Sequence, residues 1–315
     1  MQHQYVWSPD IVRQLENKAY RPRAPDEQYS SLPLENARLM KSGGFGFHDG
    51  GRQALPRLPT EEVCLCTPKA WQRFPETKLA VANVDTVTAS LALNNACALN
   101  FANAVHPGGG YLHGARAQEE DLCRLLPQLH PALVDAQEQG LYPLKPDAVL
   151  LTRDLLAVRE PGSYNLRGSL GTCSVITAAM PNGSLPESKD APCREHKHAP
   201  PLSRQEFVLF FMRRTVVDCQ SSITVSMPVE VTVVFSQLMC VLPAKSAVRA
   251  CQSCPRLFAQ QLASPDFRGA FDTVVFAIID PRGDGNLRPF REVLQTLGER
   301  SEINMCTASI RDGAG

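Results

Sequence analysis

The sequence predicts a mixed α/β fold, and two observations support this prediction. From about residue 63 onward, short apolar segments rich in β-branched residues alternate with segments in which apolar residues recur at helical spacing. This alternation is the pattern of α/β domains. With 315 residues, 43% of them hydrophobic, the chain is long enough for one large domain with an extension.

Three regions are expected along the chain. Residues 1–62 are polar and rich in proline and glycine, which predicts an accessory arm with one short helix near Pro9 to Lys18. Residues 63–300 form the main domain, and residues 301–315 form a tail.

Within the main domain, strands and helices are predicted in alternation. The strands are expected at Lys78–Val84, Ala98–Val105, Ala148–Val158, Thr172–Met180, Val229–Val234 and Thr273–Ile279. The helices are expected at Thr86–Leu93, Gln118–Leu126, Arg204–Asp218, Ala247–Leu262 and Arg288–Leu297. Pro127 is expected to break the second of these helices, because proline offers no backbone N–H to continue it.

An inserted loop is predicted at 180–205, where proline, serine and charged residues are dense. His196, His198 and Cys193 lie in this segment. We expect a solvated loop there, with no ligand role for these side chains.

Charge and cysteine content exclude several classes of protein. The 32 basic and 32 acidic residues cancel, whereas sequence-specific nucleic-acid binding usually requires a basic face. The eleven cysteines are irregularly spaced, which favours reduced thiols over a disulfide framework. Cys64 with Cys66, and Cys251 with Cys254, each supply only two ligands, so no structural zinc is expected.

No membrane association is expected, since no run of eighteen apolar residues occurs and the first twenty residues lack the apolar core of a signal peptide. An intracellular protein, cytoplasmic or nuclear, is the expectation.

The most informative motif joins Gly108-Gly109-Gly110, after seven residues, to Gln118-Glu119-Glu120. Three glycines allow positive φ and close approach to a ligand, and a run of backbone N–H groups is a recurrent anion site. The two carboxylates at the start of a helix are then available for proton transfer. A tight surface turn, followed by acidic residues that complement the helix dipole, is the structural alternative.

The stretch FANAVHPGGGYLHGARAQEEDLCR resembles the microbial-type poly(ADP-ribose) glycohydrolases, whose signature joins GGG to QEE through a spacer of this length. The resemblance runs from about Ala80 to Phe290 and is strongest in this stretch. It implies a macrodomain-like fold, a mixed sheet sandwiched between helices, that binds ADP-ribose at the ends of its strands.

The resemblance also implies roles for individual residues. Asn103 stands where the family has a ribose-binding asparagine, Glu119 would hold the hydroxyls of the ribose being cleaved, and Glu120 would be the catalytic acid. Gly108, Gly109, Gly110 and Gln118 are expected to bind substrate with them. Asp85 resembles a strand-ending aspartate that accepts a hydrogen bond from adenine, although an Asp before a helix is also a good N-cap, and the two roles are compatible.

The implied reaction is hydrolysis of the O-glycosidic bond between ADP-ribose units, without a metal or a cofactor. Glu120 would protonate the departing ribose oxygen and then take a proton from the attacking water. A helix N-terminus favours an ionised glutamate, whereas a general acid needs a raised pKa. Burial beside the ligand would supply that rise.

The sequence departs from the family pattern at 221–254. The family has a second glycine-rich loop of the form GAxGCGxF after an apolar strand, but this chain has no glycine between Gly183 and Gly269. Either the segment has diverged or the reading frame is wrong between Ser221 and Cys254. Two functions therefore stay open, a poly(ADP-ribose) glycohydrolase and a non-catalytic or impaired ADP-ribose-binding macrodomain.

Overall fold

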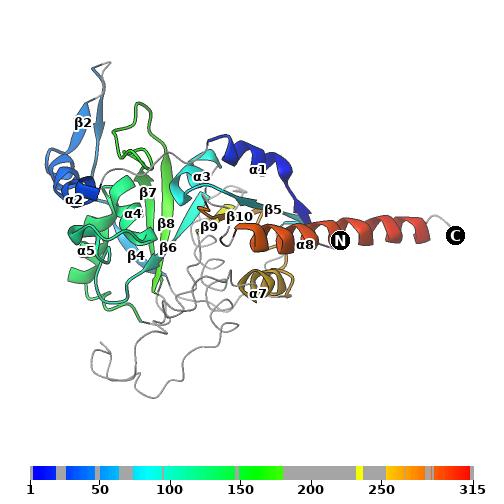
Figure 1. Ribbon diagram of the computed structural model, residues 1–315. Helices are drawn as coiled ribbons and strands as arrows, with labels where there is room; N and C mark the ends of the chain where they lie inside the picture. Colours follow the sequence, from blue (N-terminus) through cyan, green and yellow to red (C-terminus); the bar gives the residue numbers. More distant parts are fainter. Residues whose placement is uncertain are drawn as a thin grey trace. The chain divides into compact units, whose positions relative to one another are not determined.

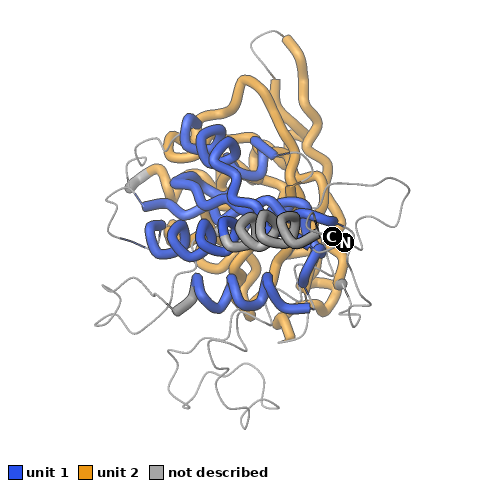
Figure 2. The backbone as a smooth tube through the Cα atoms, turned by 90° about the vertical axis from the view of Figure 1, so that its right-hand side faces the viewer, with its two compact units in different colours: residues 1–19, 66–95, 202–315 blue, residues 20–65, 96–201 orange. Residues whose placement is uncertain are grey.

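The computed structural model describes residues 3–18, 26–46, 50–63, 74–93, 96–145, 149–179, 232–236, 253–265, 267–280, 285 and 287–312 (Figure 1). The chain divides into two compact units (Figure 2). Unit 1 contains Met1–Ala19, Cys66–Asn95 and Leu202–Gly315, and unit 2 contains Tyr20–Leu65 and Ala96–Pro201.

Unit 1 is built on parallel strands in the order β1-β5-β10-β9. The strands are β1 (Gln4–Trp7), β5 (Glu76–Ala82), β9 (Thr232–Ser236) and β10 (Thr273–Ala277). Every residue of β10 is buried, in the sequence TVVFA. Strands of a parallel sheet are covered on both faces, which is why they read as continuous apolar runs.

The helices of unit 1 are α1 (Pro9–Glu16), α3 (Thr86–Ala92), α7 (Ser253–Leu262) and α8 (Leu287–Asp312). Ser8 caps α1 by accepting a hydrogen bond from the N–H of Ile11. Phe258 of α7, Phe276 of β10 and Phe290 of α8 form an aromatic cluster with ring centroids 5.1–6.0 Å apart. This cluster fixes α7 and α8 against the strands.

Unit 2 has a mixed sheet in the order β6-β8-β7-β4, with β6 parallel to β8 and the other pairs antiparallel. The strands are β4 (Thr60–Val63), β6 (Ala96–Ala102), β7 (Val149–Leu156) and β8 (Thr172–Ala179). Unit 2 also contains a separate two-stranded antiparallel sheet, formed by β2 (Gly44–Gly46) and β3 (Arg52–Ala54). The chain leaves the buried strand β6 at Ala102 and enters the glycine loop.

The helices of unit 2 are α2 (Asp26–Lys41), the 3₁₀ turn η1 (Tyr111–His113), α4 (Gln118–Leu125) and α5 (Leu129–Glu138). Helix α4 packs on β6, and α2 packs against both η1 and α4. Leu126 has φ −117° and ψ 80°, outside the helical region, because the ring of Pro127 disfavours a helical residue before it. The predicted break at Pro127 is therefore confirmed.

All six predicted strands are present, with ends that differ by at most three residues, and the short helix predicted near Pro9 is α1. Three predicted segments lie wholly or mostly outside the described residues: the helix at 204–218, the inserted loop at 180–205 and the divergent segment at 221–254. Helix α8 continues to Asp312 and so runs through the stretch expected to be a tail. The residues expected to form an arm are divided between the units, since β1 pairs with β5 and α2 packs on α4.

Within the part of the chain that the structure describes, none of the helices combines the length and the apolar character that crossing a membrane requires.

Candidate active site

The glycine loop after β6 adopts a conformation that only glycine takes without strain. Gly108 has φ +71° and Gly109 has φ +57°. A Cβ on Gly109 would lie 2.5 Å from Oε1 of Glu120 and 2.9 Å from Oε2 of Glu119. Glycine is therefore required for the loop to approach the two carboxylates this closely.

Glu119 and Glu120 open helix α4 and are both buried, at 3% and 6% exposure. Glu119 accepts hydrogen bonds from the N–H groups of Asn103 (2.8 Å) and Gly108 (3.1 Å). Glu120 accepts from the N–H groups of Gly110 (2.8 Å) and Ala117 (3.0 Å). Each carboxylate thus joins the start of the helix to the loop.

The loop was expected to offer its N–H groups to an anionic ligand, and the structure gives these groups a different use. The N–H groups of Gly108 and Gly110 donate to the glutamates, and that of Gly109 donates to the carbonyl of His106 over 2.9 Å. All three glycine N–H groups therefore have partners within the chain. The loop acts here as a clamp for the two carboxylates.

Burial raises the pKa of Glu119 to about 8. The hydrogen bond from Asn103 opposes this rise, and the neighbouring charge of Glu120 adds to it. The raised pKa favours the neutral carboxylic acid form of Glu119, which can donate a hydrogen bond as well as accept one.

Asn103 and Gln118 use their side chains to shape the site. The Asn103 Oδ1 accepts from the N–H groups of Val105 (2.8 Å) and His106 (3.0 Å), which folds the start of the loop into an Asx turn. The Gln118 side chain accepts from the N–H of Phe101 (2.9 Å) and donates to the carbonyl of Leu99 (2.6 Å). Gln118 therefore ties the first residue of α4 to β6.

Comparison with known proteins finds a family similar to this part of the chain. Residues 59–150 match the family model of the microbial-type PARG catalytic domain, where PARG is poly(ADP-ribose) glycohydrolase. The match contains β6, the glycine loop, α4 and α5. It confirms the resemblance drawn from GGG and QEE. No curated protein sequence matches the chain.

Solved structures of bacterial PARGs share the fold. PARG from Thermomonospora curvata, bound to the inhibitor ADP-HPD, is 20% identical with a TM-score of 0.63, over 84% of this chain and 99% of that one. PARG from Deinococcus radiodurans, in complex with ADP-ribose, is 21% identical with a TM-score of 0.50, over 92% of this chain and 99% of that one. The predicted macrodomain-like α/β fold is confirmed.

Asp85 is the one predicted site residue that belongs to unit 1. It caps α3 by accepting the N–H of Thr88 over 2.9 Å, so the predicted N-cap is confirmed. Burial raises the pKa of Asp85, and its hydrogen bonds with Thr88 oppose the rise. Contact with adenine stays a prediction.

Three residues around the PARG-like motif were not found by sequence reasoning. Tyr111 follows the glycines directly and is buried, and Asn36 of α2 donates to its hydroxyl over 3.0 Å. Arg124 is fully buried, hydrogen-bonds the carbonyl of Ala115 and lies 4.8 Å from the centroid of the Tyr29 ring. The sequence offered a hint for two of them, since Tyr111 directly follows GGG and Arg124 lies one helical turn after Glu120.

Among the described residues, no group of three or more His, Cys, Asp and Glu side chains is placed to hold a metal ion. Cys97, Cys123 and Cys173 are buried free thiols.

Proposed function

We propose that this chain is a poly(ADP-ribose) glycohydrolase that cleaves the O-glycosidic ribose–ribose bond of ADP-ribose polymers. The observation that carries the proposal is the pair of buried glutamates held by the N–H groups of the glycine loop. The family match over 59–150 supports the activity. The inhibitor and ADP-ribose bound to the two bacterial PARGs support the ligand class.

In the proposed mechanism, Glu120 is the general acid and base. It protonates the departing ribose oxygen and then removes a proton from the attacking water, a contribution of about 10²- to 10⁴-fold in rate. The N–H groups of Gly110 and Ala117 stabilise its carboxylate after the proton has left, because they donate to the charged form.

Glu119 is proposed to hold the ribose hydroxyls. Its carboxyl group, with a pKa raised to about 8 by burial, carries a proton near neutral pH and offers the hydroxyls both a donor and an acceptor. A neutral Glu119 also avoids repulsion from the carboxylate that forms on Glu120. Neighbouring residues of a helix point in different directions, which suits this division of labour.

The substrate-binding roles of the remaining residues stay proposals. Asn103 and Asp85 are proposed to contact the ribose and the adenine. Gly108, Gly109 and Gly110 are proposed to let the substrate approach the carboxylates, and a Cβ on Gly109 would lie against both of these groups. Gln118 is proposed to act through its hold on β6, because both ends of its amide are engaged there.

We place the activity inside the cell, in the cytoplasm or nucleus, where it would reverse ADP-ribosylation of macromolecules. Three buried thiols among the described residues suit a reducing compartment. The neutral net charge gives no support for sequence-specific nucleic-acid binding.

The test uses purified protein and defined poly(ADP-ribose), with chromatography to measure released ADP-ribose. Glu120→Gln is expected to abolish release while calorimetry still detects ADP-ribose binding. Glu138→Gln, an exposed change at the end of α5, is the matched control and should behave like the unmodified protein. Equal release by Glu120→Gln and the control would contradict the role of Glu120.

A second candidate is a non-catalytic ADP-ribose-binding macrodomain. The lack of any glycine between Gly183 and Gly269 favours it, because the family's second loop uses glycines to hold the diphosphate. Binding of ADP-ribose without release from polymer by the unmodified protein would support this candidate. Sequencing the transcript across Ser221 to Cys254 would decide whether the segment is read in the correct frame.

A further inference from the structure

We infer that Asn36 of α2 is a positioning residue for the proposed reaction, because its side chain holds the C-terminal end of α4 and the residue after the glycine loop in one clamp. The inference rests on the proposed function. Asn36 belongs to α2, a helix in the N-terminal stretch that was expected to be an accessory arm.

Helix α4 ends just before Pro127. In a helix the carbonyl of Cys123 would accept the N–H of the residue four positions later, but that residue is Pro127, which has no N–H. Asn36 supplies the missing donor, with its Nδ2 lying 3.3 Å from the carbonyl oxygen of Cys123 and 3.1 Å from that of Arg124. The side chain of Asn36 thus caps the C-terminal end of α4, the helix that carries Glu119 and Glu120.

Asn36 also contacts the residue that follows the glycine loop. The same Nδ2 lies 3.0 Å from the hydroxyl of Tyr111, the residue that follows Gly110. The N–H of Tyr111 in turn donates to the carbonyl of Gly108 over 3.0 Å. Asn36 therefore contacts both the helix that carries the two glutamates and the residue next to the glycine loop that binds them.

The orientation of the Asn36 amide follows from the chemistry of its partners. Its Oδ1 accepts from Nε of Arg159 over 2.7 Å, and a guanidinium can only donate. Its Nδ2 faces carbonyl oxygens, which can only accept. At 2% exposure, water cannot replace these bonds, so an exchange of the amide groups would leave several buried polar atoms unpaired.

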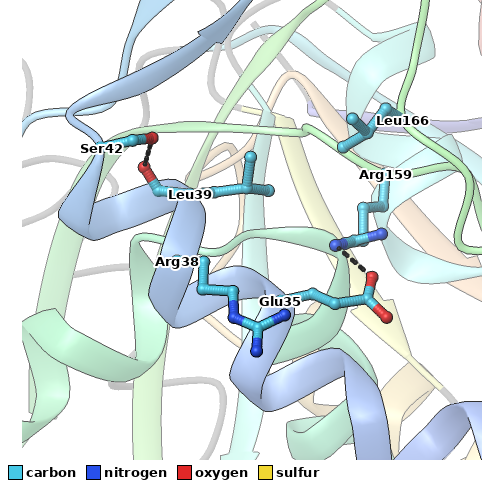
Figure 3. A pocket seen from close by; sticks show the side chains of 6 residues that line it. All are labelled: Glu35, Arg38, Leu39, Ser42, Arg159 and Leu166. Carbon is cyan, nitrogen blue, oxygen red and sulfur yellow. Dashed lines mark hydrogen bonds and ion pairs between the residues drawn. The ribbon is translucent and has the colours of Figure 1, made fainter.

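Arg159 fixes Asn36 from the other side. It also donates to the carbonyl of Tyr164 over 2.7 Å and forms an ion pair with Glu35 at 3.1 Å. Glu35 and Arg159 face a cavity of about 410 Å³ that is also lined by Arg38, Leu39, Ser42 and Leu166 (Figure 3). Glu35 is half-exposed at this cavity and lies next to Asn36 in the sequence, and its side chain hydrogen-bonds Ser31 and Arg159, which makes it a suitable control position.

The experiment compares Asn36→Asp and Tyr111→Phe with the control Glu35→Gln, all as full-length chains. Asn36→Asp keeps the oxygen that Arg159 needs but loses the donors to α4, whereas Tyr111→Phe removes only the hydroxyl. Glu35→Gln breaks the ion pair of Arg159 and leaves the bonds of Asn36 in place.

Both test variants are expected to lower kcat per folded molecule on the order of tenfold, with KM changed much less, as loss of one or two positioning hydrogen bonds predicts. The alkaline limb of the pH profile, above which the proposed acid lacks its proton, is expected to move to higher pH, because a displaced loop no longer donates to the carboxylate that forms. Iodoacetamide should label Cys123 faster, as read by mass spectrometry of its peptide. Glu35→Gln should change none of these quantities.

The inference is overturned if Asn36→Asp and Tyr111→Phe match Glu35→Gln in kcat, in pH profile and in labelling of Cys123. A fall in melting temperature with unchanged kcat per folded molecule also overturns it, since that result describes a purely structural residue. An unmodified protein that releases no ADP-ribose rejects the proposed function instead, and the labelling of Cys123 then decides the clamp alone.

Discussion

Gly110 donates its backbone N–H to Oε1 of Glu120 over 2.8 Å, which ties the glycine loop to the proposed catalytic acid. Gly108 makes the same kind of bond to Glu119 at 3.1 Å. The glycine loop and the start of α4 are therefore bonded together, and the positions of the two carboxylates depend on the backbone of the glycines.

Gly109→Ala tests this dependence. The added Cβ would lie 2.5 Å from Oε1 of Glu120, so one of the two groups must move. We expect a loss of about 10²-fold in kcat/KM, as displacement of reacting groups by about 1 Å typically causes. Steady-state hydrolysis of poly(ADP-ribose) measures it.

Gly140→Ala is the matched control for this substitution. Gly140 also has positive φ, at +82°, but a Cβ there would meet nothing within 4 Å. It should cost about 1–2 kcal/mol in the free energy of unfolding from backbone strain, with activity retained. Equal losses of activity in the two variants would refute the steric argument.

The raised pKa of Glu119 predicts how stability depends on pH. In the unfolded chain Glu119 releases its proton near its ordinary pKa of 4.5, whereas in the folded protein it holds it up to about 8. Between pH 4.5 and pH 8 the folded state binds more protons than the unfolded chain. The contribution of Glu119 to the free energy of unfolding is therefore greatest below pH 4.5 and is lost as the pH rises through 8.

Glu119→Gln should remove this part of the pH dependence, which urea denaturation at pH 5, 6.5 and 8 can measure. The variant and the unmodified protein should differ most in slope between pH 5 and pH 8. An identical pH dependence in both proteins would show that Glu119 ionises normally in the fold.

Gln118→Leu separates positioning from ligand contact. The substitution removes the hydrogen bonds to Leu99 and Phe101, which should lower the free energy of unfolding by about 1–3 kcal/mol because backbone groups of β6 lose their partners. Calorimetric melting measures this effect. Unchanged stability with weaker ADP-ribose binding would instead assign Gln118 to the ligand.

Asp85→Ser distinguishes the N-cap of α3 from the proposed adenine contact. Serine caps a helix about as well as aspartate, so stability should change by less than about 0.5 kcal/mol. If Asp85 accepts the adenine amino group, ADP-ribose should bind several-fold more weakly, by the loss of about 1 kcal/mol for one hydrogen bond. The hypoxanthine analogue, which lacks that amino group, should bind both proteins equally, and a parallel loss for both ligands would reject the adenine contact.

Six strands, β5 to β10, could be predicted from the sequence because most of their residues are apolar, as in β10 and β6, which are buried on both faces. The short strands β1 to β4 were not predicted, because they lie in or at the end of the polar N-terminal stretch. Helix α2 could not be predicted either, since its sequence DEQYSSLPLENARLMK is polar and contains Pro33. The helix is held by tertiary contacts, such as those of Asn36 with residues 75 to 88 positions away.

The motif itself could be predicted, but the partners of its N–H groups could not. Glycine spacing predicts positive φ at Gly108, which the structure has. It does not predict which group accepts the N–H of Gly108, because the acceptor, Glu119, lies eleven residues later in the chain. The raised pKa of Glu119 likewise depends on burial by distant segments, which the motif alone does not reveal.

The most direct test of the account is the release of ADP-ribose from poly(ADP-ribose) by the unmodified protein beside Glu120→Gln. The account predicts release by the unmodified protein and a loss of at least about 10²-fold in the variant, with ADP-ribose binding retained. Binding without release by the unmodified protein, or equal release by both proteins, would contradict it.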